Sequence, residues 1–333
     1  MIYTKPYFYD DFICKADKCE DTCCAGWEVD IDCDTCNKYR NVGGDFGSRL
    51  LDGIDFGSEQ PCFRLKENER CFFLAQNGLC DIYSELGEDA LCDICREHPR
   101  FYDFFDGITE MGLGLCCEKV CEMVFASNKP ITFESYEEDS DCTDEEDDIY
   151  FCIREKCFDI IANREKTISA RISELLEYAV AVQNEIFADD YELKSDIDKK
   201  SLLQSVVDMF AETDPINDEW KTYISEMRES FNPIFSAGEN FNFSDTEYEQ
   251  ILTYIMYRHF MQSRFTGEVL SAVCFSVVSL IFIYLSDCKT FYVKSAFEKE
   301  DRINNVKLWS KQTEYSEENT QYIFDKAFDL FYL

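Results

Sequence analysis

This chain has few basic residues for its length. Its 333 residues include 32 lysines and arginines against 68 aspartates and glutamates, so the formal net charge is -36. A field of this sign repels phosphate backbones, and we therefore expect no nucleic acid among the partners. It favours cationic partners, including protein surfaces that carry lysines, although acidity also simply keeps a chain soluble.

The start of the chain lacks a basic-then-apolar leader, and the sequence has one long uncharged run. Because the first residues do not follow the signal-peptide pattern, we expect a cytoplasmic protein with reduced thiols. The uncharged run covers residues 269–286, at the short limit for a membrane span of about 20 residues. Four serines interrupt it and acidic residues flank it, which favours a buried helix and no membrane span.

Alternating apolar patterns typical of strands are scarce, and helical periodicity dominates the second half. Apolar residues recur at helical spacing over residues 168–186, and Ser244-Asp-Thr-Glu247 has the form of a capping box at the start of another helix. A further amphipathic segment follows near Ile323. These patterns predict a bundle of helices.

A block of carboxylates divides the chain. Residues 134–148 contain ten carboxylates and no base, which is typical of a solvated linker, with docking of a basic partner as the alternative. We predict a mainly α protein: an irregular cysteine-rich N-terminal domain organised by a metal cluster (1–133), an acidic linker (134–149) and an all-helical C-terminal domain (150–333).

Cysteines are concentrated before this block. Fourteen of the 19 lie between Cys14 and Cys121, in tight pairs and triplets. Disulfide frameworks of this density are typical of short secreted chains, so metal binding is the preferred interpretation over disulfides or inert thiols. Soft thiolates select zinc, copper(I) or iron–sulfur clusters.

The spacing of the cysteines favours an iron–sulfur cluster over zinc. Zinc usually takes two short ligand pairs, and Cys92-x2-Cys95 supplies one. Adjacent Cys23 and Cys24 seldom both reach one tetrahedral ion, whereas a cluster presents several metal corners. The Cys-x2-Cys-x2-Cys run of bacterial ferredoxins is absent, and so is the Cys-x3-Cys-x2-Cys triplet of radical enzymes.

The motifs around these cysteines resemble those of flagellin lysine N-methylases. They are Cys14-x4-Cys19-Glu-Asp-Thr-Cys23-Cys24-Ala-Gly-Trp27, Cys71-Phe-Phe-Leu, Asn77-Gly-Leu-Cys80, Leu86-Gly-Glu and Cys95-x3-Pro99-Arg100. This front part is also similar to a broader family of zinc- or iron-chelating cysteine-cluster domains. The chain departs from the family pattern at Phe72 and Glu118, which stand where prolines are usual, and at His98, which stands where an aromatic residue is expected to pack.

The resemblance implies transfer of a methyl group from S-adenosylmethionine to lysine side chains of flagellin. It also implies an iron–sulfur cluster, most readily of the 4Fe-4S type with zinc as the alternative metal. The implied metal ligands are Cys14, Cys19, Cys23, Cys24, Cys71, Cys80, Cys92, Cys95 and Cys117. A metal-binding or electron-transfer protein without methylation activity is the alternative function, and a scaffold for basic proteins is a third.

No motif locates the catalytic base or the cofactor pocket. A lysine with a pKa near 10.4 must be desolvated or deprotonated before it accepts a methyl group. Gly112-x-Gly114 lacks the third glycine of a nucleotide-binding turn, so we expect the pocket between the two domains, where ligand sites are common. Trp27 is expected to cover the cluster, or else to make cation–π contact with a ligand. His259 is expected to be a core residue.

Overall fold

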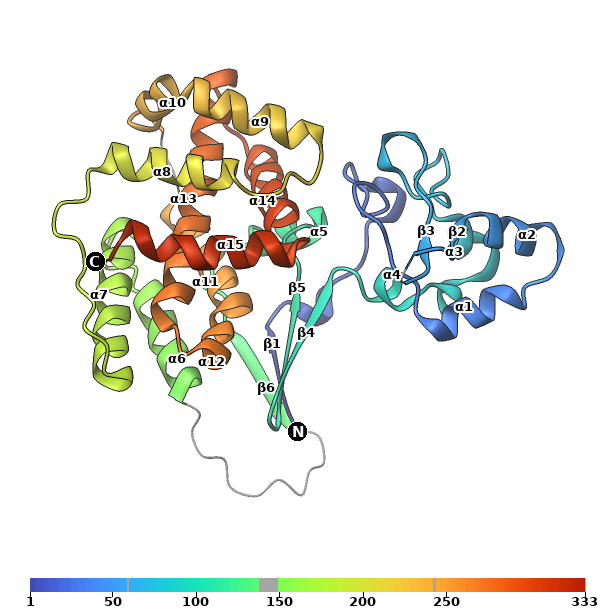
Figure 1. The fold of residues 1–333 in the computed structure, drawn as a ribbon, viewed down its shortest axis with the longest axis horizontal. Helices are drawn as coiled ribbons and strands as arrows, with labels where there is room; N and C mark the ends of the chain where they lie inside the picture. The colour runs from blue at the N-terminus through green and yellow to red at the C-terminus, as the bar shows by residue number, and fades with distance from the viewer. Residues whose placement is uncertain (59, 138–148, 242–243, 333) are drawn as a thin grey trace.

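The computed structural model describes residues 1–58, 60–137, 149–241 and 244–332. Figure 1 shows a helical body, a small sheet along its lower edge, and a cysteine-rich lobe to one side. We use "lobe" for residues 24–97, excluding residue 59. Together these parts form a mainly α protein, as the sequence predicts.

The body is built around one long helix, α13 (Val269–Lys294), which packs against α7, α8, α10, α11, α14 and α15. Polar side chains start several helices; for example, Ser244 accepts a hydrogen bond from the Glu247 amide at the start of α11. The helices of the body are α5 (Glu118–Val124), α6 (Ile149–Ile161), α7 (Ile168–Phe187), α8 (Lys199–Ala211), α9 (Asp218–Glu229), α10 (Phe231–Gly238), α11 (Asp245–His259), α12 (Ser263–Thr266), α13, α14 (Lys299–Glu314) and α15 (Glu317–Ala327).

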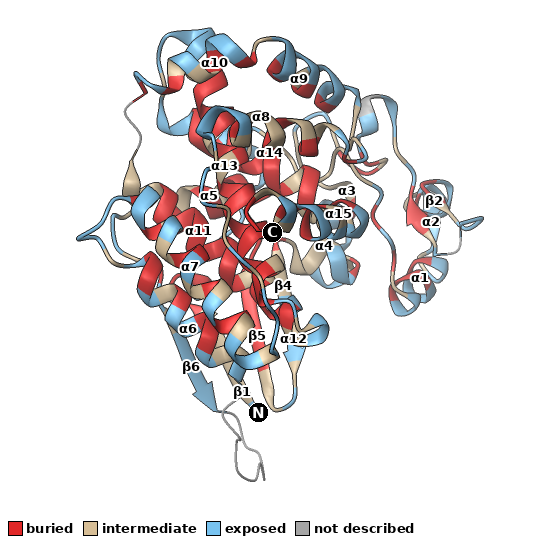
Figure 2. Ribbon diagram, turned by 60° about the vertical axis from the view of Figure 1, so that its left-hand side comes forward, coloured by how far each residue is buried: buried red, intermediate tan, exposed pale blue. Residues whose placement is uncertain are grey.

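Helix α13 is long and apolar enough to cross a membrane, judged by length and composition alone. However, 83 % of its most apolar 18-residue window is buried inside the protein, and the core helix of a globular body has the same properties. Figure 2 shows buried residues running through the helices at the centre of the body. The sequence-based expectation of a buried helix therefore agrees with the structure.

A four-stranded sheet lies against the body, and the sequence analysis did not anticipate it. The strand order is β4-β5-β1-β6, in which β5 is antiparallel to β4 and parallel to β1, and β6 is antiparallel to β1. Phe133 on β6 stacks on Tyr257 of α11 with ring centroids 4.1 Å apart. The strands are β1 (Ile2–Pro6), β4 (Arg100–Phe105), β5 (Ile108–Leu113) and β6 (Phe133–Glu137).

The lobe has its own small apolar core, separate from the core that the sheet shares with the body. That small core includes Val29, Ile31, Tyr39, Leu50, Phe63, Phe73 and Ile82. Short elements surround it: α1 (Cys33–Arg40), α2 (Gly44–Asp52), β2 (Ile54–Asp55), β3 (Cys62–Phe63), α3 (Asp81–Leu86) and α4 (Asp93–Glu97). Six 3-10 turns complete the described chain: η1 (Tyr9–Asp11), η2 (Ala16–Lys18), η3 (Glu67–Glu69), η4 (Glu88–Ala90), η5 (Phe260–Gln262) and η6 (Phe328–Leu330).

The division into residues 1–133, 134–149 and 150–333 stays a prediction. The core of the body includes Phe8, Leu113 and Val120 from the cysteine-rich part of the sequence. Of the acidic segment, residues 134–137 belong to β6, residue 149 begins α6, and residues 138–148 lie outside the described residues.

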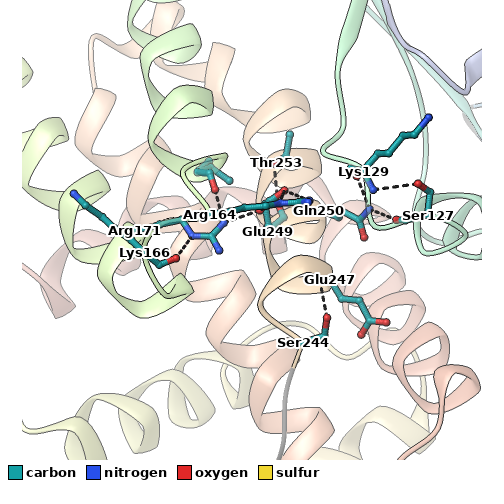
Figure 3. A network of polar contacts seen from close by, with 11 residues as sticks. Ser127, Lys129, Arg164, Lys166, Arg171, Ser244, Glu247, Glu249, Gln250 and Thr253 are labelled. Carbon is teal, nitrogen blue, oxygen red and sulfur yellow. Dashed lines mark hydrogen bonds and ion pairs between the residues drawn. The ribbon is translucent and has the colours of Figure 1, made fainter.

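Buried ion pairs connect the helices of the body. Glu249 on α11 accepts hydrogen bonds from Arg171 of α7 at 2.7 Å and from Arg164, which precedes α7, at 2.7–3.2 Å (Figure 3). The next residue, Gln250, donates to the carbonyl oxygens of Ser127 and Lys129 at 2.7 and 2.9 Å. Helix α11 is thereby joined to α7 on one side and to the segment before β6 on the other.

We expect Arg164→Ala to lower the free energy of unfolding by about 1–2 kcal/mol. The Arg164 side chain is 38 % exposed, and Glu249 keeps Arg171 as a partner, so the loss stays moderate. The exposed Lys166→Ala variant is the control and should change stability by less than about 0.5 kcal/mol. Urea unfolding followed by circular dichroism measures both; equal values for the two variants would contradict the role of Arg164.

Candidate metal centre

Backbone pairing within the lobe joins the segments that carry Cys24 and Cys71. The Cys71 amide donates to the Cys24 carbonyl at 2.8 Å, beside a bridge between Ala25 and Arg70. The chain then turns back through a bridge between Leu74 and Cys80. Cys95 lies in α4, and its thiol has Cys24 and Cys71 as charge neighbours. We call Cys24, Cys71, Cys80 and Cys95 the first thiol group.

Burial and short hydrogen-bonded turns set the acidity of these thiols. Burial raises the pKa of Cys71 to about 12, and it also raises the pKa of Cys80. The backbone N–H groups of Phe73 at Cys71, and of the first turn of α3 at Cys80, partly oppose this rise in pKa. A hydrogen bond from Cys23 lowers the pKa of Cys24 to about 7. N–H donors of this kind orient thiolate ligands and tune a bound metal.

Cys92 is placed differently from its neighbour Cys95. It precedes α4 as the N-cap residue and is fully buried in the apolar core of the lobe. A hydrogen bond from the Cys95 thiol lowers the pKa of Cys92. The carboxylates of Asp32 and Asp93 oppose that shift of the Cys92 pKa.

The loop 14–24 meets the start of α5 through Cys19 and its neighbours. Glu118, the first residue of α5, accepts from the Glu20 amide at 3.0 Å and from the Cys19 thiol at 3.7 Å, and it pairs with Lys15. These contacts hold the loop beside Cys117, the N-cap residue of α5. We call Cys14, Cys19, Cys23 and Cys117 the second thiol group.

Mutual effects on pKa indicate that the members of the second thiol group lie near one another. Cys14 and Cys117 lie close enough to Cys23 to raise the pKa of its thiol, and Cys19 raises the pKa of Cys117 in the same way. Burial raises the pKa of Cys117 to about 12, while the backbone N–H groups of Lys119 and Val120 oppose that shift. Cys14 and Cys23 are exposed, so this group lies nearer to solvent than the first.

An aromatic junction joins the loop to the body. Trp27 donates its indole N–H to the Cys23 carbonyl at 2.8 Å, and its ring lies 5.0 Å from the ring of Tyr315, just after α14. The His98 ring lies 6.1 Å from Trp27. Burial lowers the pKa of His98 to about 4 and raises that of Tyr315, so both are neutral near pH 7. We call Trp27, His98 and Tyr315 the aromatic junction.

Paired charges hold the junction in place. Asp21 lies 2.7 Å from the Lys311 ammonium and 3.2 Å from Lys307, both on α14. Arg258 of α11 pairs with the buried Glu314 at 3.2 Å. These three cations near the junction therefore have carboxylate partners, and the loop is attached to α14 as well as to α5.

Tyr315, Lys311 and Arg258 are residues that the sequence analysis missed. They lie more than 100 residues beyond the cysteine motifs, and no local pattern distinguishes them from other tyrosines and cations. The placement of His98 beside an indole agrees with the expected packing role. His259 contacts Glu314 at 2.9 Å and packs on Phe275, as expected of a core histidine.

All cysteines in the described part of the chain are free thiols. In the same part, no three His, Cys, Asp or Glu side chains converge as ligands of a single metal ion do. The nine proposed ligands thus stay a prediction, as does a pocket between the lobe and the body. A cleft of about 240 Å³ lies elsewhere, between α8 and α9, and its lining includes Trp220, Lys221 and Arg228 but no cysteine.

The fold and the grouped thiols define a mainly α protein with a cysteine-rich lobe. Comparison with known proteins finds three similar sequences. Over 134 residues, 36 % of this chain, it is 26 % identical to the lysine-N-methylases of Salmonella choleraesuis (strain SC-B67) and Salmonella typhimurium (strain LT2). It is also 26 % identical over 134 residues to the flagellar biosynthetic protein FliU of Salmonella muenchen, 75 % of which is covered.

The match covers 32 % of each lysine-N-methylase, so the chain spans about a third of the length of these relatives. No protein-family model matches the chain, and no solved structure matches it. The matches support the family that the cysteine motifs suggest.

Proposed function

We propose that this protein is a protein-lysine N-methyltransferase that moves the methyl group of S-adenosylmethionine to lysines of flagellin. The observation that carries the proposal is the similarity to two proteins named lysine-N-methylase. The name of the third relative, a flagellar biosynthetic protein, supports flagellin as the substrate. The acidic charge of the chain suits a substrate presented through lysines.

The proposed metal is an iron–sulfur cluster, and the thiols fit it by their chemistry. The two thiol groups supply only soft ligands, and backbone N–H groups near Cys80 and Cys117 favour their thiolate forms, as they do in metal thiolate sites. When bound, a cluster would supply iron, which can act as a Lewis acid or exchange electrons, next to the aromatic junction.

The aromatic junction is the surface that we propose for the cationic reactants. Trp27, neutral His98 and neutral Tyr315 offer uncharged rings, and ring faces attract sulfonium and ammonium groups. In the reaction, the bond from the methyl carbon to sulfur breaks as the bond to the lysine nitrogen forms. The sulfonium becomes a neutral thioether, and the lysine ammonium loses one proton before attack.

We expect Trp27→Ala to lower the rate of flagellin methylation roughly 10- to 30-fold, because a desolvated cation–π contact is worth about 2 kcal/mol. Trp27→Phe keeps a ring face and should retain most of the rate. The measurement is methyl transfer from radiolabelled S-adenosylmethionine to purified flagellin. Tyr83→Ala, on an exposed lobe residue, is the control. If Trp27→Ala matched that control at equal metal content, the junction would not bind the reactants.

The function itself is tested with the anaerobically purified protein, S-adenosylmethionine and flagellin. Methylated lysines detected by mass spectrometry, together with binding of the cofactor in equilibrium dialysis, would support the proposal. A protein that holds metal but neither binds S-adenosylmethionine nor methylates flagellin would instead be a metal-binding or electron-transfer protein.

A further inference from the structure

We infer that the outward side of the four-stranded sheet binds an extended, lysine-bearing segment of a protein partner. Four aromatic side chains make up this surface, which we call the outer sheet face: Tyr3, Tyr102, Phe104 and Tyr136. The inference rests on the proposed function, because an enzyme that modifies protein lysines needs a surface for the segment around the lysine. It goes further by placing that surface, and its test does not depend on methylation.

The register of the strands puts these four side chains on one side of the sheet. Tyr3 of β1 lies opposite both Thr109 of β5 and Tyr136 of β6. Phe104 of β4 lies opposite the same Thr109. Residues directly opposite in a sheet point to one side, and so do residues two apart in one strand, which adds Tyr102. The rings of Tyr3 and Tyr136 stack with centroids 5.3 Å apart.

The other side of the same sheet packs on the helical body. Phe101 of β4 lies with its ring centroid 6.5 Å from that of Tyr254 on α11, and Glu110 of β5 pairs with Arg154 of α6. Both strand residues belong to the alternate set of side chains, which points away from the outer sheet face. Figure 1 shows the body helices α6 and α12 to one side of the sheet.

The rings of the outer sheet face are exposed. Phe104 is 74 % exposed, and Tyr102 and Tyr136 are 37 % and 38 % exposed. On β5, Thr109 and Met111 point to the same side but are only 4 % and 8 % exposed, so the aromatic rings themselves form the surface. Exposed apolar side chains gathered on one face and bordered by polar groups indicate a binding surface.

A lysine of the chain itself shows how this face holds an ammonium group. Lys5 points to the same side of β1 as Tyr3, and its Nζ lies 5.1 Å from the ring centroid of Tyr136. Its carboxylate partner is Asp10, at 2.5 Å. An ammonium over a ring face and beside a carboxylate is attracted by both. Phe104 presents a further exposed ring on β4, where a lysine of the partner would find the same kind of contact.

Carboxylates border the outer sheet face and select the charge of the partner. Glu134 follows the same side of β6 as Tyr136, and Glu97 accepts a hydrogen bond from the Tyr102 hydroxyl at 3.0 Å. Asp106, which follows β4, is fully exposed. Aromatic side chains on a sheet can also stack the bases of RNA. The net charge of -36 repels a phosphate backbone and attracts lysines, so a cationic protein segment is the favoured occupant.

The outer sheet face continues along β4 toward the aromatic junction. Strand β4 begins at Arg100, close after His98 of the junction. An extended chain between His98 and Phe104 spans at most about 20 Å, at about 3.3 Å per residue. A partner segment that docks at Phe104 therefore needs only about six extended residues to bring a lysine to the junction.

The test measures the Kd of full-length protein for a fluorescein-labelled peptide of alternating lysine and serine. Fluorescence anisotropy at physiological ionic strength is used, because long-range attraction to the acidic chain is then largely screened. We expect Phe104→Ala/Tyr136→Ala to raise the Kd about 5- to 30-fold through the loss of two cation–π contacts. Phe104→Tyr/Tyr136→Phe keeps both ring faces and should bind like the parent. Tyr292→Ala, on an exposed residue of α13, is the control. Equal Kd values for the double alanine variant and this control would overturn the inference.

Photo-crosslinking with a benzophenone-bearing version of the peptide locates it on the protein. Labels on β1, β4 or β6 would support the inference, and labels confined to other elements would overturn it. Two other occupants are tested in parallel. An oligouridylate that binds while the peptide does not, or a parent dimer that Phe104→Glu converts to a monomer in sedimentation velocity, would also overturn it. Neither S-adenosylmethionine nor flagellin is present, so failure here and failure of the proposed function are separate results.

Discussion

Removing the proposed metal should unfold the lobe while the helical body stays folded. The lobe has only a small apolar core of its own, and a core of this size rarely supplies more than about 3–5 kcal/mol. Structural metal sites contribute about 10 kcal/mol or more in small domains. Without metal, the ordering entropy of the lobe should exceed what its apolar contacts provide.

Hydrogen exchange with mass spectrometry checks this expectation. After anaerobic treatment with a chelator, amides in residues 24–97 should exchange at rates typical of unfolded peptides, excluding residue 59. Amides in α13, which lies at the centre of the body, should keep their protection. A lobe that stays protected without metal would show that its own core is sufficient. Readdition of the metal should restore protection, which separates reversible unfolding from oxidation of the thiols.

Local sequence patterns predicted the helices of the body well. Apolar periodicity located α7 within about a residue, because a helix that buries one face must repeat its apolar residues at helical spacing. The Ser244 cap and the buried α13 were also predicted correctly. These features depend on neighbouring residues along the chain, so a single sequence is enough to find them.

The sheet could not be predicted in the same way. Strand β1 pairs with β6 about 130 residues later, and β4 reads Arg-Phe-Tyr-Asp-Phe-Phe, which alternates only weakly. The sheet forms only because strands that are far apart in the sequence pair and because helices cover one of its faces. No pattern within either strand reports that pairing.

The candidate site shows the same limit. The cysteines were visible because their close spacing, which is typical of metal ligands, is a local feature of the chain. The side chains that contact the cysteine loop could not be predicted, because they are distant in the sequence. Lys311 pairs with Asp21, 290 residues away, and Tyr315 packs against Trp27 over a similar separation. Ligand chemistry can be read along the chain, whereas the surface next to it depends on how the loop and α14 pack.

The second large effect should come from Glu314, the last residue of α14. Its side chain is 1 % exposed and contacts His259 at 2.9 Å, Arg258 at 3.2 Å and the Tyr254 hydroxyl at 3.2 Å. We expect Glu314→Gln to lower the free energy of unfolding by about 2–3 kcal/mol, because it leaves the partly buried Arg258, whose side chain is 21 % exposed, without a counter-charge. Glu318→Gln, on an exposed residue of α15, should cost less than about 0.5 kcal/mol.

The pKa of Glu314 determines how the destabilisation by Glu314→Gln changes with pH. Burial would raise the pKa of Glu314, but Arg258 and His259 outweigh that effect, so the pKa in the folded protein lies below its ordinary value. The unfolded chain consequently binds the proton first as pH falls. The stabilisation is complete above the ordinary carboxyl pKa near 4.3 and decreases as pH falls through the folded value. The difference between parent and Glu314→Gln should shrink over that range.

Urea unfolding at several pH values measures this difference. A double variant, Glu314→Leu with Arg258→Met, should recover part of the lost stability, because neither charge is then buried alone. It should still disturb the aromatic junction, since Arg258 packs beside Gly114 and Cys116, next to Tyr315. If Glu314→Gln were as stable as the parent at neutral pH, the pair would not hold α11 to α14. The position of Tyr315, the residue that follows Glu314, would then depend on the contacts of the lobe alone.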